Sequence, residues 1–181
     1  MQIRETGLSG LRILSPKVHK DSRGFFLETF REEFFQNLDA PVHFVQDNHA
    51  RSEAAGVLRG LHYQAPPAAQ TKLVWVSRGA AFDVAVDLRR ASPTYGKSYS
   101  LVLTAENFLR LLIPKGFAHG YMTLEPGTEF HYKVDHYYAP EHEGGLRRDD
   151  PALSIDWPKC EPIMTERDRN WPLLADLPAI F

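Results

Sequence analysis

Cysteine, net charge and long hydrophobic runs are all scarce in this chain of 181 residues. The single cysteine, Cys160, excludes an intrachain disulfide and a four-cysteine zinc site. A net charge of −2 offers no overall attraction to nucleic acid or to an acidic membrane. The first residues lack the apolar run of a signal peptide, and no later run is long enough to span a bilayer. We therefore expect a soluble, cytoplasmic protein that binds neither nucleic acid nor membrane.

Several well-known catalytic motifs are missing as well. The chain has no Gly-x-Ser-x-Gly elbow, no Gly-x-Gly-x-x-Gly turn and no phosphate loop of the Walker type. Cys160 lies in a proline-rich segment without a neighbouring base, which indicates an inert thiol and not a nucleophile. Internal repeats, low-complexity tracts and linkers are also absent, so we expect one domain over residues 1–181.

Short apolar runs separated by turn residues dominate what is present. The 13 prolines and 12 glycines are scattered between these runs, a pattern typical of an all-β domain. Residues rich in β-branched and aromatic side chains predict strands over 57–64, 73–77, 81–88, 99–103, 110–113, 120–124 and 130–138. One short helix is expected over 31–38, with Phe34 and Phe35 as its apolar side. Strands at this spacing favour a sandwich or jelly roll with a few short helices.

Alternation along the strands indicates which side chains share a face. In the strand expected over 130–138, Tyr132 and Tyr138 fall on the apolar face and so are expected to point inward.

A hairpin closed by Arg78 and Gly79 would place Lys72 and Asp83 on one face among small residues, as in a lumen with room for a ligand. The opposite face of this expected hairpin is apolar throughout, so it must pack on a second sheet or on a partner subunit. That face consists of Leu73, Trp75, Phe82, Val84 and Val86.

The segment 56–64 carries Arg59 and His62 on either side of Gly60 and Leu61. A regular strand would place Arg59 and His62 on opposite faces, whereas a bulge at Gly60 could turn both toward one pocket. The alternative is an edge strand with a solvated arginine and a packed histidine.

The segment 114–120 reads Pro-Lys-Gly-Phe-Ala-His-Gly and delivers His119 from a tight turn onto the next strand. Pro-x-Gly-x-x-His resembles the second metal motif of the cupins, which are jelly-roll barrels. The first cupin motif would supply two further histidines, but the chain has His62-Tyr63-Gln64 there, with one histidine. Two histidines make a poor site for zinc or ferrous iron, so no metal is expected. From composition alone, His119 has either a structural or a catalytic role.

An ordered set of motifs resembles the dTDP-4-dehydrorhamnose 3,5-epimerases over most of the chain. These motifs lie in segments 21–26, 44–48, 56–64, 70–73, 83–89, 92–96, 113–120, 132–133, 149–151, 157–158 and 165–168. The resemblance implies a cupin-like jelly roll, that is, a double-stranded β-helix barrel. It also implies epimerisation of a dTDP-linked 4-keto-6-deoxyhexose at C3 and C5, without a cofactor.

The resemblance assigns four catalytic roles. His62 corresponds to the base, and Asp168 to the carboxylate that orients it, a pair suited to proton transfer near neutral pH. Lys72 corresponds to the cation beside the developing C4 oxyanion. Tyr132 corresponds to the acid that returns a proton from the opposite face.

Further residues correspond to ligand contacts in the family, among them His119 near the C4 oxygen, Tyr138 against the base, and Arg59. An arginine suits phosphate because its guanidinium binds two oxygens at once. The family's homodimer implies that an N-terminal arm within residues 1–50 reaches the partner subunit's site. The full set of expected binding residues is Arg23, Phe26, Glu28, Gln46, Asp47, Asn48, Arg59, His119, Tyr138, Glu143 and Arg167.

Departures from the family pattern leave other functions open. Arg148 replaces a tryptophan, Ala50 replaces a serine, and Arg167 replaces a lysine that are usual in the family. The alternatives are a mono-epimerase that inverts only C3 or C5, an epimerase for another nucleotide, a metal-dependent cupin oxygenase or isomerase, and a non-catalytic binder of nucleotide sugars. Together, His62, Lys72, Tyr132 and Asp168 argue against a simple binder, because binding needs no acid opposite a base.

Overall fold

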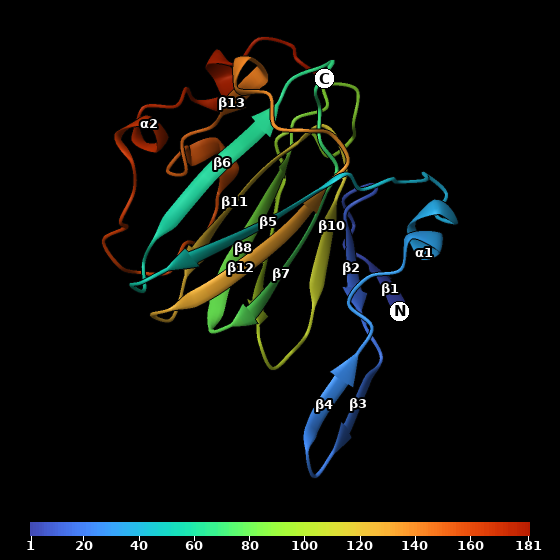
Figure 1. Ribbon diagram of the computed structural model, residues 1–181. Helices are drawn as coiled ribbons and strands as arrows, with labels where there is room; N and C mark the ends of the chain where they lie inside the picture. Colours follow the sequence, from blue (N-terminus) through green and yellow to red (C-terminus); the bar gives the residue numbers. More distant parts are fainter.

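Two antiparallel sheets face each other in the computed structural model, which describes residues 1–181 (Figure 1). One sheet has six strands in the order β1-β2-β10-β7-β12-β5, and the other has five in the order β13-β6-β11-β8-β9. The strands are β1 Gln2–Glu5, β2 Arg12–Ser15, β3 Val18–Asp21, β4 Gly24–Leu27, β5 Gln46–Ser52, β6 Leu58–Gln64, β7 Lys72–Arg78, β8 Ala80–Asp87, β9 Ser98–Thr104, β10 Arg110–Ile113, β11 Phe117–Thr123, β12 Thr128–Val134 and β13 Glu143–Gly145. The α-helices are α1 Glu32–Gln36 and α2 Glu166–Arg169, with short 3-10 turns at Pro140–His142, Pro151–Leu153 and Leu174–Asp176. None of the helices combines the length and the apolar character needed to cross a membrane.

This arrangement confirms the predicted all-β jelly roll, and each of the seven predicted strands is present. The largest difference lies in the strand predicted over 130–138, because β12 ends at Val134. Tyr138 therefore does not share a strand face with Tyr132. It lies in the loop that follows, where it is 54% exposed.

The predicted hairpin between β7 and β8 is wrong. These strands follow each other through Arg78 and Gly79, but β7 belongs to the six-stranded sheet and β8 to the five-stranded sheet. Gly79 has a φ of +74°, and a Cβ atom there would lie 2.5 Å from the hydroxyl of Thr128, so the chain crosses between sheets through a turn that only glycine fits. The two inward faces nevertheless meet across the barrel, because Val74 and Ala85 belong to one buried cluster.

The apolar outer faces are covered by the chain itself. On the six-stranded sheet, Leu73 packs in a cluster with Phe35 of α1 and with Val42. On the five-stranded sheet, Val84 packs with Leu174 from the C-terminal segment. Other segments of the same chain therefore bury these side chains, in place of the second sheet or partner subunit expected from the sequence.

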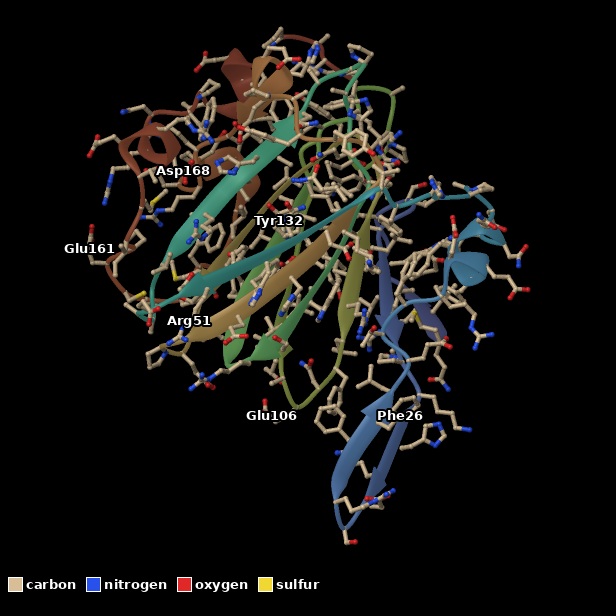
Figure 2. The ribbon with its side chains drawn as sticks, viewed as in Figure 1. Phe26, Arg51, Glu106, Tyr132, Glu161 and Asp168 are labelled. Carbon is tan, nitrogen blue, oxygen red and sulfur yellow. The ribbon has the colours of Figure 1, made fainter.

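A two-stranded hairpin, β3 and β4, extends away from the sandwich (Figures 1 and 2). Phe25 and Phe26 on β4 are 61% and 72% exposed. Phe25 contacts Phe108 edge-on with ring centroids 4.8 Å apart, whereas Phe26 stays largely in solvent, so the hairpin carries an apolar surface that this chain covers only in part.

Candidate active site

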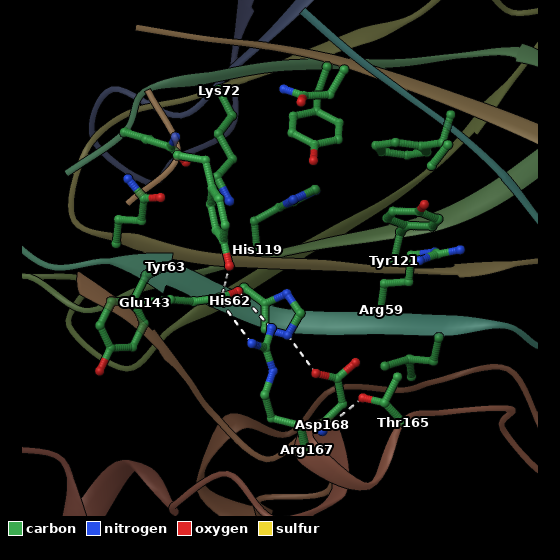
Figure 3. Close-up of a pocket in the computed structure, with 18 of the residues that line it drawn as sticks. Arg59, His62, Tyr63, Lys72, His119, Tyr121, Glu143, Thr165, Arg167 and Asp168 are labelled. Atoms are coloured by element: carbon green, nitrogen blue, oxygen red, sulfur yellow. Dashed lines mark hydrogen bonds and ion pairs between the residues drawn. The ribbon is translucent and has the colours of Figure 1, made fainter. Parts of the chain in front are cut away.

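A cavity of about 780 Å³ opens between the two sheets and is lined mainly by strands of both (Figure 3). It is large enough for a ligand of the size of a nucleotide sugar. The cavity brings together most of the residues that the sequence analysis selected. These are Gln46, Asn48, Arg59, His62, Lys72, His119, Tyr132, Tyr138, Glu143, Arg167 and Asp168.

His62 points into this cavity because β6 is irregular. Gly60 has a φ of +116°, and a Cβ atom there would lie 2.6 Å from the Cα of Gly120 on β11. The register between β6 and β11 shifts between the partners of His119 and Tyr121, as in a bulge. Arg59 and His62 consequently both line the cavity, which confirms the predicted effect of Gly60.

His62 and Asp168 are joined by a hydrogen bond with 2.6 Å between Nε2 and Oδ1. Asp168 lies in the first turn of α2, where its backbone N–H donates to the hydroxyl of Thr165 at 3.2 Å. The carboxylate is 4% exposed. Burial opposes its ionisation, but the hydrogen bond and the charge of His62 outweigh that effect and hold the pKa of Asp168 below its usual range. The carboxylate is thus kept charged beside the imidazole that it orients.

A second histidine–aspartate pair lies next to the first. His119 on β11 is the register partner of His62, and its Nε2 lies 2.9 Å from Oδ2 of Asp83 on β8. Asp83 is fully buried, and its other oxygen, Oδ1, has no hydrogen-bond partner. The sequence predicted Asp83 near a lumen, but its pairing with His119 was not predicted. An acidic residue inside the otherwise apolar Phe82–Val86 stretch was the signal that could have found it.

Lys72 and Tyr132 stand on the six-stranded sheet, opposite the histidine pairs on the five-stranded sheet. Burial lowers the pKa of Lys72 to about 8, although the charges of Glu143 and Asp83 act in the opposite direction. The phenol of Tyr132 is protonated at neutral pH, and burial raises its pKa further above the usual value. The cavity therefore offers a basic imidazole on one wall and a proton donor on the other.

The rim of the cavity carries a charged network. Tyr138 donates to Glu143 at 2.7 Å, and Arg167 donates two hydrogen bonds to the same carboxylate at 2.8 and 2.9 Å. These side chains come from the loop after β12, from β13 and from α2, so they link three segments around the opening. Tyr138, with half of its surface exposed, presents an aromatic face at the entrance.

Four expected binding residues do not line the cavity. Asp47 pairs with Lys133 at 2.6 Å on the outside of the sheet, because side chains alternate along β5 and the neighbours Gln46 and Asn48 turn inward. The expected grouping of Asp47 with its two neighbours is therefore corrected.

The other three, Arg23, Phe26 and Glu28, lie on or just after the projecting hairpin. Arg23 pairs with Asp21 at 2.7 Å, and Glu28 pairs with Arg31 within the same arm. Figure 2 shows Phe26 well away from Tyr132 and Asp168 of its own chain.

The only three side chains grouped closely enough to share a metal ion lie elsewhere. His49, Glu129 and His131 have ligand atoms within 4.8 Å of one another. His49 and His131 are register partners on β5 and β12, next to inward-facing Asn48 and Tyr132, so they face outward. Their rings stack with centroids 4.1 Å apart, and Nε2 of His131 lies 2.7 Å from the hydroxyl of Ser77.

The model of one protein family matches residues 5–176, and that family is described as dTDP-4-dehydrorhamnose 3,5-epimerase. The enzyme of that name from Escherichia coli strain K12 is 48% identical over 179 residues, with 98% of this chain and 96% of the relative covered. A crystal structure of dTDP-6-deoxy-D-glucose-3,5-epimerase from Legionella pneumophila, in complex with dTDP-4-keto-L-rhamnose, superposes with a TM-score of 0.93 at 44% identity and covers 98% and 95% of the two chains. A 3'-monoepimerase from Streptomyces bikiniensis, in complex with dTDP-quinovose, superposes with a TM-score of 0.88 at 34% identity and covers 93% and 86%.

Proposed function

We infer that this chain, which belongs to the dTDP-4-dehydrorhamnose 3,5-epimerase family, is an isomerase that inverts C3 and C5 of dTDP-4-keto-6-deoxy-D-glucose to give dTDP-4-keto-L-rhamnose. The observation that supports the proposed mechanism best is the placement of His62 and Tyr132 on opposite walls of one cavity. Inversion at carbon requires removal of a proton from one face and delivery of a proton to the other.

The first step takes a proton from C3 or C5. Both carbons flank the C4 ketone, so the electron pair of the broken C–H bond moves into an enolate with its negative charge on the C4 oxygen. His62 accepts the proton on Nδ1, since its Nε2 is bonded to Asp168. Asp168 fixes the orientation of the ring and stabilises the imidazolium that forms.

The enolate oxygen is stabilised by Lys72, whose buried ammonium is still mostly charged at pH 7 with a pKa of about 8. His119, held by Asp83, supports the same oxygen from the other wall. Tyr132 then donates its phenolic proton to the carbon from the face opposite His62, and the inverted centre results. The second carbon follows by the same sequence after the two groups exchange protons with solvent.

The nucleotide is held by the remaining residues of the cavity. Arg59 binds phosphate oxygens, Gln46 and Asn48 contact the nucleotide and sugar, and Tyr138 stacks on the base. Glu143 and Arg167 contact the ligand at the rim. Each of these roles is a proposal that rests on cavity placement together with the family resemblance.

The functional unit that we propose is a homodimer of single-domain subunits. Arg23, Phe26 and Glu28 are too far from their own cavity to contact its ligand, and Phe26 is 72% exposed. An arm that inserts into the partner's cavity would bury this side chain and complete the nucleotide site. We expect sedimentation equilibrium to show a dimer, and Phe26→Ala to raise KM for the nucleotide sugar about tenfold with little change in kcat. A monomeric wild-type protein would contradict this arrangement.

The cytoplasmic location stays a prediction, which fractionation of source cells checks.

The reaction is tested by NMR in D₂O with chelator-treated protein and dTDP-4-keto-6-deoxyglucose. We expect deuterium at C3 and at C5 together with net inversion. Tyr132→Phe should still allow exchange by His62 but lose inversion, because the opposite face then lacks its acid. Tyr137→Phe, an exposed phenol outside the cavity, is the matched control and should behave like wild type.

Each other outcome identifies a different error. Full inversion by Tyr132→Phe would contradict the role of Tyr132. Deuterium at one carbon would indicate a mono-epimerase, the activity named for the Streptomyces bikiniensis relative. Exchange that appears only after ferrous iron or zinc is added would indicate a metal-dependent cupin enzyme.

A further inference from the structure

Asp168 receives a second donor that the resemblance to the family did not indicate. Oδ1, the oxygen that pairs with His62 at 2.6 Å, also accepts a hydrogen bond from Nε1 of Trp171 at 3.3 Å. The indole also lies edge-on to the imidazole, with ring centroids 6.0 Å apart and an interplanar angle of 75°. One tryptophan thus contacts both members of the pair.

A glycine on strand β13 leaves the space that the indole of Trp171 occupies. Gly145 on β13 is the register partner of His62, and a Cβ atom at Gly145 would lie only 2.5 Å from the indole ring. The φ of Gly145 is not positive, so the backbone does not require glycine here. The reason for glycine is the space that the indole needs. On another side, the guanidinium of Arg167 lies 5.5 Å from the centre of the indole ring. The backbone is fixed just beyond, where the N–H of Arg147 donates to the carbonyl of Pro172 at 3.0 Å.

We propose that Trp171 is a positioning residue for the proposed base: it holds Asp168 in place beside His62, and Gly145 provides the space that lets it do so. The proposal rests on the function inferred above. Trp171 does not line the cavity, so it reaches the reaction only through Asp168 and His62. It is not a catalytic residue in its own right.

The hydrogen bond also adjusts the basicity of the pair. A donor to a carboxylate stabilises its charged form, and the Trp171 N–H is one of the contacts that lower the pKa of Asp168 against the effect of burial. Without this donor, Asp168 would bind a proton more strongly. Because Nε2 of His62 lies 2.6 Å from the same carboxylate, we expect the proton between them to be held more strongly as well. The acid limb of kcat/KM, that is, the fall of kcat/KM on the acidic side of its pH profile, should therefore move to higher pH.

The variant Trp171→Phe tests this directly because it keeps an aromatic ring and removes the N–H. We expect kcat to fall about threefold to tenfold, KM to stay unchanged, and the acid limb of kcat/KM to move upward by roughly half a pH unit. The other charged or titratable groups that face the pair are Arg59 on β6, Lys72 on β7, Asp83 on β8, His119 on β11, Tyr132 on β12, Glu143 on β13 and Arg167 on α2. The variant replaces none of these groups and keeps an aromatic ring beside Arg167. Loss of packing alone would loosen Asp168 and would move the limb downward or not at all.

Trp157→Phe is the matched control. Trp157 also donates its indole N–H, to the carbonyl of Arg148 at 2.9 Å, and it packs on Phe82 outside the cavity. This control should lose some stability but keep the wild-type pH profile. Equal changes in the two variants, an unchanged profile in Trp171→Phe, or a downward shift would each overturn the proposal.

A second variant, Gly145→Ala, displaces the indole without removing it. We expect it to reproduce the effect of Trp171→Phe, and the double variant to be no worse than the more affected single one, because both changes act through the same contact. Additive losses would overturn the role of Gly145. NMR titration of the ring protons of His62 in the free protein follows the pair without substrate. It therefore tests the positioning role even if the wild-type protein fails to epimerise the sugar, a result that would refute the proposed function alone.

Discussion

The cavity holds two histidine–aspartate pairs of nearly the same chemistry but of very different settings. The side chain of His62 is 24% exposed, and its aspartate comes from α2, 106 residues further along the chain. The side chain of His119 is 8% exposed, and its aspartate is supplied by the adjacent strand β8. Asp168 has donors from both His62 and Trp171 on one oxygen, whereas Oδ1 of Asp83 has no partner at all.

This difference in setting distinguishes His62, which exchanges protons, from His119, which only stabilises charge on the C4 oxygen. A base must reach solvent and substrate in turn, so partial exposure suits His62, as does a partner carboxylate that accepts more than one hydrogen bond. His119 and Asp83 are enclosed by the core, where Tyr121 stacks on Phe130 with ring centroids 3.8 Å apart. A fixed dipole in such a dry wall stabilises developing charge without moving a proton.

The two pairs should differ most when each histidine is replaced by asparagine. His62→Asn should reduce kcat by about 10³-fold or more and abolish deuterium exchange at both carbons, because the other imidazole, His119, is assigned to the C4 oxygen and not to a carbon. His119→Asn should reduce kcat by only about tenfold and leave exchange measurable, because Lys72 still stabilises the enolate. Solvent-exchange NMR beside steady-state kinetics measures both effects. Comparable losses of exchange in the two variants would mean that the exposed and the buried pair share the proton transfer.

The sequence was sufficient to predict features set by local chemistry. Gly60 signalled a bulge because only glycine tolerates that backbone next to β11, and the structure shows Arg59 and His62 on one cavity. Strand positions followed from β-branched and aromatic runs, and α1 from its paired phenylalanines. For the strands and α1, the neighbours that decide the structure lie within a few residues along the chain.

Features set by the assembly of the two sheets could not be predicted. Gly79 looked like a hairpin turn, and nothing local reveals that β7 and β8 separate into different sheets. Asp47 was grouped with Asn48 by motif, and its outward partner Lys133 is supplied only by the pairing of β5 with β12. Asp83 and His119 lie 36 residues apart, and only the pairing of β8 with β11 brings them together.

Replacing each aspartate by asparagine should also affect the two pairs differently, with smaller losses of kcat than the histidine variants. Asp168→Asn should reduce kcat about 10²-fold, because the imidazolium loses the charge that stabilises it and the ring loses its preferred tautomer. Asp83→Asn should reduce kcat no more than about tenfold, because an amide oxygen can still accept the hydrogen bond from His119. Steady-state rates at pH 7 check the order. A larger loss for Asp83→Asn would show that the buried pair carries the proton.

The same two variants differ again at high pH. Asp83 is one of the charges that raise the pKa of Lys72 against the effect of burial, which leaves it at about 8. Asp83→Asn removes that charge, so the pKa of Lys72 should fall further and the alkaline limb of kcat should move to lower pH by a few tenths of a unit. Asp168 is not among the charges that act on Lys72, so Asp168→Asn should leave this limb in place. If both variants moved the alkaline limb equally, the limb would not report Lys72. A shift confined to Asp83→Asn would instead assign the buried pair a second task, which is to keep the lysine charged while the exposed pair transfers the proton.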